Sequence, residues 1–131
     1  MRLPDWEKRL NALVAETRKR PHAFGQWDCL LWSGAVVEAV TGQDHWRAHV
    51  GKYKSQVGAY RYLKKLGAKS PQEYLDSLFP AKPAAFAMRG DLVLASDGIP
   101  AVCMGAFALS VSDEGMVRVP RSDWQGAWNV E

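Results

Sequence analysis

The run Pro80-Ala81-Lys82-Pro83 divides the chain into two halves with different hydrophobic patterns. Before it, apolar residues recur at helical spacing; after it, short apolar segments alternate with turn residues, which is typical of strands. Proline interrupts elements of both kinds, so the run marks a boundary between them. Helices followed by antiparallel strands predict an α+β fold, and the length predicts a single domain over residues 1–131.

The first half predicts four helices, over residues 4–19, 28–40, 57–66 and from 71 to about 79. Pro21 closes the first helix, and Thr41-Gly42 supplies the C-terminal stop of the second. Ser70-Pro71-Gln72-Glu73 combines an N-cap, a proline in the first turn and a capping-box glutamate. In the third helix Val57, Tyr60, Leu63 and Leu66 recur at helical spacing, and Gly67 ends the helix.

The second half predicts short strands that are joined by turns at Asp97-Gly98 and Asp113-Glu114-Gly115. The expected strands are Asp91–Ala95, Pro100–Gly105, Phe107–Ser112 and Met116–Val119. A last segment, Ala127–Val130, is expected to form an edge strand.

Composition excludes several classes of protein. No apolar run approaches the roughly 18 residues that span a bilayer, and the start of the chain lacks the apolar stretch of a secretory signal. The net charge is only +3, and the cations are spread along the chain apart from Arg18-Lys19-Arg20 and a scatter from Lys52 to Lys69, so we do not expect a nucleic-acid partner. Two cysteines are too few for a disulfide framework and form no CxxC pair, so neither a structural metal nor a cofactor is expected.

Cys29 is the candidate nucleophile, because it lies where a loop becomes the second predicted helix. Backbone N–H groups and the positive end of the helix dipole favour a thiolate at such a position. Trp27 and Trp32 are expected to shape a cleft beside it. The alternative is that Cys29 is a small buried hydrophobe, a common role for a cysteine in an apolar helix.

Two sequence segments resemble a known family. Trp27-Asp28-Cys29 opens a helix that ends at Val40-Thr41-Gly42, and Arg89-Gly90-Asp91-Leu92-Val93-Leu94 starts the first core strand. Both resemble the NlpC-type cell-wall peptidases, which have a small papain-like fold, and the likeness covers about residues 22–119. The chain is most similar to a compact phage-encoded branch that is found beside tail-tip genes. This resemblance implies a virion protein of the phage tail, made in the host cytoplasm.

The expected catalytic histidine is absent from the matching position. Active members of that family begin the next strand with a histidine in a His-Val-Gly-Ile pattern, whereas this chain has Gly98-Ile99-Pro100-Ala101-Val102-Cys103-Met104-Gly105. His45 and His49, in the irregular segment after the Cys29 helix, are the remaining candidates for the base. They read equally well as a solvated helical turn, and two histidines alone are a weak metal signal.

The other polar and thiol groups have simpler interpretations. His22 precedes Cys29 by seven residues and is expected at the surface, with a place near the mouth of the Cys29 cleft as the alternative. Asp28 is interpreted as the helix cap, Asp91 as a strand-start residue and Cys103 as a packed thiol.

Six tryptophans are more than this length of chain ordinarily carries. Trp46, Trp124 and Trp128 lie in the less regular segments, so we predict that they anchor protein–protein contacts. The alternative is that the Trp-rich tail folds back over the edge of the sheet.

Two functions therefore remain open. The favoured one is a structural or assembly component of a phage tail tip, with a degenerate catalytic site and other tail proteins as partners. The alternative is an active cysteine peptidase or amidase that cleaves peptidoglycan peptides, with Cys29 attacking and His45 or His49 acting as base.

Overall fold

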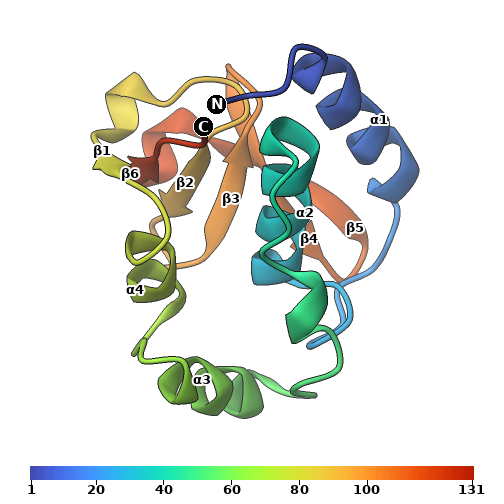
Figure 1. Cartoon of the computed structure of the whole chain (residues 1–131), viewed down its shortest axis with the longest axis vertical. Helices are drawn as coiled ribbons and strands as arrows, with labels where there is room; N and C mark the ends of the chain where they lie inside the picture. The colour runs from blue at the N-terminus through green and yellow to red at the C-terminus, as the bar shows by residue number, and fades with distance from the viewer.

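Four α-helices precede the strands of one antiparallel sheet, so the predicted α+β class is confirmed. The computed structural model describes residues 1–131, and Figure 1 shows α2 lying across the sheet. The helices are α1 (Trp6–Thr17), α2 (Cys29–Thr41), α3 (Gln56–Lys65) and α4 (Pro71–Asp76). The strands are β1 (Ala81–Lys82), β2 (Leu92–Ala95), β3 (Pro100–Cys103), β4 (Phe107–Ser112), β5 (Gly115–Pro120) and β6 (Trp124–Trp128).

The central helix α2 is buried on most sides because nearly all its residues are apolar or small. It packs against α1 on one side and against β3 and β4 on the other. The buried Trp32 indole donates a hydrogen bond to the Leu109 carbonyl, at 3.0 Å, and so ties the helix to β4. Gly42 ends the helix in a left-handed conformation, with φ of 83°, as the sequence predicted. None of the helices is long and apolar enough to cross a bilayer.

The strand order in the sheet is β1-β6-β2-β3-β4-β5. β6 therefore lies inside the sheet, between β1 and β2, and the prediction of an edge strand there was wrong. The strand also begins three residues earlier than predicted, at Trp124. The edge position is taken by the two-residue strand β1, which lies within the proline-containing run that divides the halves of the sequence.

A β-bulge in β6 sends two tryptophans to opposite faces of the sheet. Leu94 pairs with Gly126, but the next residue, Ala95, pairs with Trp124, so Gln125 is the extra residue. Trp128 then faces the main core with α2, while Trp124 joins a smaller core on the other face. That smaller core also holds Cys103, which is fully buried as predicted.

The helix α3 lies at the end of the molecule farthest from the chain termini, and α4 lies between it and β1 (Figure 1). α4 begins as predicted, because the Ser70 hydroxyl accepts a hydrogen bond from the Glu73 N–H at 3.2 Å. The third predicted helix is confirmed as α3, and of the four apolar residues that mark it only Leu63 is buried. The reason is that no other element of the chain covers that side of the helix. Val57, Tyr60 and Leu66 are 61%, 43% and 45% exposed.

A buried carboxylate, Asp91, ties the two ends of the chain together directly before β2. It forms ion pairs with Arg2, at 3.0 Å, and with Lys82. Its oxygens also accept hydrogen bonds from the backbone N–H groups of Met88, at 2.9 Å, and Val130, at 3.1 Å. The N-terminal segment, the β1 region and the C-terminal segment therefore meet at one side chain.

Candidate functional site

Asp28 builds the start of α2. One carboxylate oxygen accepts hydrogen bonds from the N–H groups of Leu30, at 3.1 Å, and Leu31, at 3.0 Å. The other accepts from the Gly25 N–H, at 3.0 Å, and from the Tyr53 hydroxyl, at 2.6 Å. The predicted cap is confirmed, and the same side chain fixes the loop before α2 and the segment before α3.

Cys29, the first residue of α2, is partly buried beside that carboxylate. Burial raises the pKa of its thiol to about 12, and the charge of Asp28 contributes in the same direction. Backbone N–H groups of Leu30 and Cys29 itself favour the thiolate, as the sequence predicted, but they do not outweigh burial. The thiol is therefore protonated at pH 7 in this conformation, and the helix start does not by itself yield the activated thiolate that the sequence favoured.

The Cys29 cleft is a hollow of about 120 Å³ with mainly apolar walls. Its walls come from the loop before α2, from α3 and from the β2–β3 turn, and Phe24, Tyr60 and Ile99 are its exposed apolar members. Trp27 and Trp32 were expected to shape it, but both are fully buried and do not line it. Their rings belong to the core below, 5.9 Å apart between centroids.

The structure separates the two predicted bases from the thiol. The hydroxyls of Tyr62 and Tyr74 hydrogen-bond the two ring nitrogens of His49, at 2.6 and 2.9 Å, and partial burial lowers its pKa. His45 contacts the Gln43 amide oxygen, at 3.3 Å. Both imidazoles line a second, smaller cavity, which Cys29 does not reach. No group of three or more His, Cys, Asp or Glu side chains is arranged to hold a metal ion.

His22, which was expected at the surface, is the histidine that lines the Cys29 cleft. It is half-buried, and its ring packs edge-on against Phe24 with 4.5 Å between centroids. Neither the His22 ring nor the Cys29 sulfur takes part in any side-chain hydrogen bond of the structure, so the two form no catalytic pair in this conformation.

The three tryptophans predicted as surface anchors are mostly covered. Trp124 and Trp128 are 8% and 2% exposed, which corrects the prediction for both. The Trp128 indole donates to the Asp76 carboxylate at 2.8 Å, and the Trp124 indole donates to the Val119 carbonyl at 3.2 Å. Trp46 is half-buried and packs over Gly34 of α2. A Cβ atom at position 34 would lie 2.3 Å from the Trp46 Cβ, so only glycine fits there.

Sequence reasoning missed Tyr53, Tyr60 and Ile99 as residues of the site. Tyr53 lies in the segment that was interpreted only as polar and irregular, and Tyr60 was used only as a marker of the third helix. Ile99 stands just after the predicted Asp97-Gly98 turn, and the absence of a histidine there was the one available signal.

A family model described as a domain of unknown function (DUF6950) matches residues 1–130 of the chain. The chain belongs to this family. The match covers the Cys29 cleft and every strand of the sheet, so the DUF6950 fold includes the whole site. No curated protein and no solved structure matches the chain.

Proposed function

We propose that this DUF6950 chain is an assembly protein of a phage tail tip, built on an NlpC-like, papain-like fold whose catalytic site is degenerate. The observation that carries the proposal is the state of Cys29. Its thiol is protonated at neutral pH, and no imidazole is hydrogen-bonded to it. A cysteine peptidase needs both a thiolate and a proton carrier.

The cleft geometry supports the same proposal. In the active peptidases that the sequence resembles, the strand after the Gly-Asp-Leu-Val-Leu segment begins with the catalytic histidine. In this chain Ile99 immediately precedes the corresponding strand, β3, and lines the Cys29 cleft. An apolar side chain therefore lies where proton transfer would be required, and the cleft is suited to packing rather than to hydrolysis.

The second candidate function is the peptidoglycan peptidase, and one observation favours it. His22 and Cys29 line the same cleft, so a rotation of the imidazole would be the route to a catalytic pair. In that function His22, rather than His45 or His49, is the base.

Two measurements test the proposal. Purified protein is incubated with peptidoglycan, and released peptides are quantified beside the Cys29→Ala and His22→Ala variants. We expect no release above background from any of the three. Release that disappears in both variants would establish the peptidase and end the degenerate-site proposal.

The assembly role is tested in a phage that carries the gene. Deletion of the gene is expected to reduce plaque formation through defective tails, visible by electron microscopy. A copy with Cys29→Ala is expected to restore it fully. Normal tails in the deletion strain would contradict an assembly role, and failure of a folded Cys29→Ala protein to complement would contradict an inactive site.

A further inference from the structure

The segment from Lys52 to Lys69, which contains α3, carries an unusual concentration of positive charge. It holds six cations and no Asp or Glu, whereas the whole chain has 17 cations and 14 carboxylates. The rest of the chain is therefore net negative, with eleven cations against fourteen carboxylates. The six cations are Lys52, Lys54, Arg61, Lys64, Lys65 and Lys69.

All six of these side chains are exposed and unpaired. The ion pairs of the structure involve only Arg2, Arg47 and Lys82 among the basic residues. None of the six side chains donates a hydrogen bond either, since Lys69 contacts the Glu73 carboxylate only through its backbone N–H, so their charge is not neutralised by an ion pair within the chain. Six unpaired cations within eighteen residues repel each other, which favours an anionic partner.

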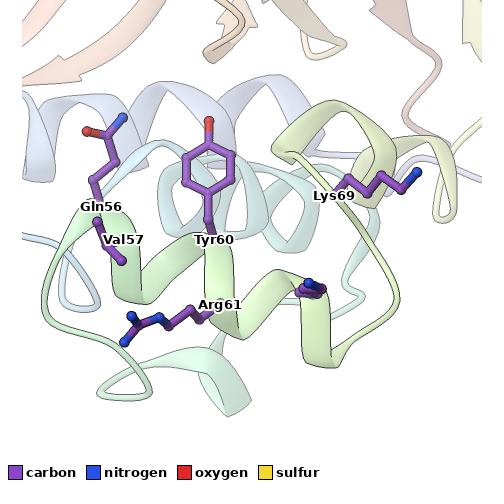
Figure 2. Close-up of a pocket in the computed structure, with 6 residues that line it drawn as sticks. Gln56, Val57, Tyr60, Arg61 and Lys69 are labelled. Carbon is purple, nitrogen blue, oxygen red and sulfur yellow. The ribbon is translucent and has the colours of Figure 1, made fainter.

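The same helix exposes apolar side chains. Val57, Tyr60, Arg61 and Lys64 follow the i, i+3, i+4, i+7 spacing of one helix face. With Gln56 and Lys69 they line an open groove of about 600 Å³, which we call the α3 groove. Figure 2 shows Val57, Tyr60 and Arg61 projecting from the helix, with Lys69 from the segment that follows it. Val57 and Tyr60 are 61% and 43% exposed, so an apolar partner surface would gain by covering them.

The α3 groove adjoins the Cys29 cleft, because Gln56 and Tyr60 line both. A bound chain therefore meets cations and aliphatic surface first and a mainly apolar hollow next to them. A nucleic acid would use the cations, but Tyr60 is the groove's only ring on which a base could stack, and the exposed aliphatic Val57 would stay uncovered. Exposed cations beside exposed aliphatic and aromatic side chains therefore favour a protein segment as the partner.

We propose that the α3 groove binds an acidic segment of a partner protein that carries aliphatic or aromatic side chains between its carboxylates. The carboxylates lie against Arg61, Lys64 and Lys69, and the apolar side chains cover Val57 and Tyr60. This inference deepens the proposed assembly role by naming a surface and a partner chemistry, and it needs no reaction at Cys29.

Fluorescence anisotropy with labelled probes tests the inference on the full chain. The first probe is a glutamate-rich peptide that carries a leucine and a phenylalanine. The second has serine in place of both apolar residues, and the third is an oligothymidylate of matched charge. We expect the first probe to bind most tightly and its affinity to fall with added salt, because exposed charges contribute to it.

Charge-reversal variants locate the contact. Arg61→Glu with Lys64→Glu is expected to weaken the first probe about tenfold or more, which is about 1.4 kcal/mol. The matched control, Lys8→Glu with Lys19→Glu, changes the net charge equally at exposed sites outside the groove and should leave the affinity within about twofold. Circular dichroism confirms that each variant is folded.

Each contrary result overturns the inference in a distinct way. Tighter binding of the oligothymidylate would make the groove a nucleic-acid surface, and equal losses in the two double variants would mean that only net charge matters. Failure of the first probe to bind would reject the acidic segment. Probe binding and peptide release from peptidoglycan are measured separately, so that failure of this inference and failure of the degenerate-site proposal are distinguishable.

Discussion

Asp28 and Asp91 are equally buried carboxylates with different partners. Asp91 is held by two cations, Arg2 and Lys82, in addition to backbone N–H groups. Asp28 is held only by neutral donors, which are three backbone N–H groups and the Tyr53 hydroxyl. The charge of Asp91 is thus balanced within the structure, while that of Asp28 is not and contributes to the raised pKa of Cys29. Asp91 also raises the pKa of a neighbouring thiol, that of Cys103, but there the charges of Arg121 and Lys82 act in the opposite direction, whereas no cation opposes Asp28 at Cys29.

Breaking the Asp91 site should have the largest effect. Asp91→Ala leaves Arg2 and Lys82 without their carboxylate and leaves two backbone N–H groups without an acceptor. We expect the free energy of unfolding in urea to fall by about 3–5 kcal/mol. Asp113→Ala, in the exposed β4–β5 turn, is the control and should change it by less than about 0.5 kcal/mol. A loss below about 1 kcal/mol at Asp91 would show that the charge balance does not support the fold.

Removing the Asp28 carboxylate should cost less, because no cation is left unpaired. Asp28→Ala removes the cap of α2 and leaves the Gly25 N–H and the Tyr53 hydroxyl without a hydrogen-bond acceptor. The expected loss is about 2–3 kcal/mol in the same urea titration. A loss as large as that of Asp91→Ala would contradict the distinction between the two sites.

Tyr53→Phe sharpens the comparison, since it removes one donor from Asp28 and keeps the ring. The hydroxyl donates to a buried carboxylate at 2.6 Å, so we expect a loss of about 1–2 kcal/mol. Tyr60→Phe, on the exposed face of α3, is the matched control and should be neutral in thermal unfolding. Equal effects of the two variants would mean that the Asp28 contact adds nothing.

The protonation of the Cys29 thiol should have the smallest effect of the four on the free energy of unfolding at neutral pH. Its effect should appear only at high pH. Because burial raises the pKa of the Cys29 thiol to about 12, labelling of this thiol by iodoacetamide should stay slow through pH 9. Labelling of the Cys29→Ala variant measures the contribution of Cys103, which is subtracted. Because the folded chain keeps this proton longer than the unfolded chain does, the free energy of unfolding should fall as the pH rises from about 9 toward 12. Asp28→Asn should lower the thiol pKa, since it removes the neighbouring charge. Fast labelling near pH 6 in the parent protein would contradict this account.

Features with local causes were predictable from the sequence. The Asp28 cap, the Gly42 stop and the Ser70 cap each depend on a few neighbouring residues, and all three are confirmed. Features that depend on distant partners were not. The helical spacing of Val57 and Tyr60 marks a face of α3, but it does not say whether another element covers that face.

The site shows the same limit. The position of Cys29 at a helix start followed from its immediate neighbours. Its raised pKa did not, because the burial that causes it involves Tyr53, Ile99 and α3, which lie far along the chain. The internal position of β6 likewise depends on pairing with β2, about thirty residues earlier in the sequence, and a pattern read along one strand carries no information about that partner.

The sheet order also affects synthesis on the ribosome. β1 has only β6 as a neighbour in the sheet, and β6 follows it by about forty residues. At roughly 5–20 residues per second, β1 has no strand to bond for about 2–8 seconds after it is made. During that interval the other edge of β2 is also open. A nascent chain of this family would therefore expose two unpaired backbone edges until its last strand emerges, which is the condition in which chaperones bind.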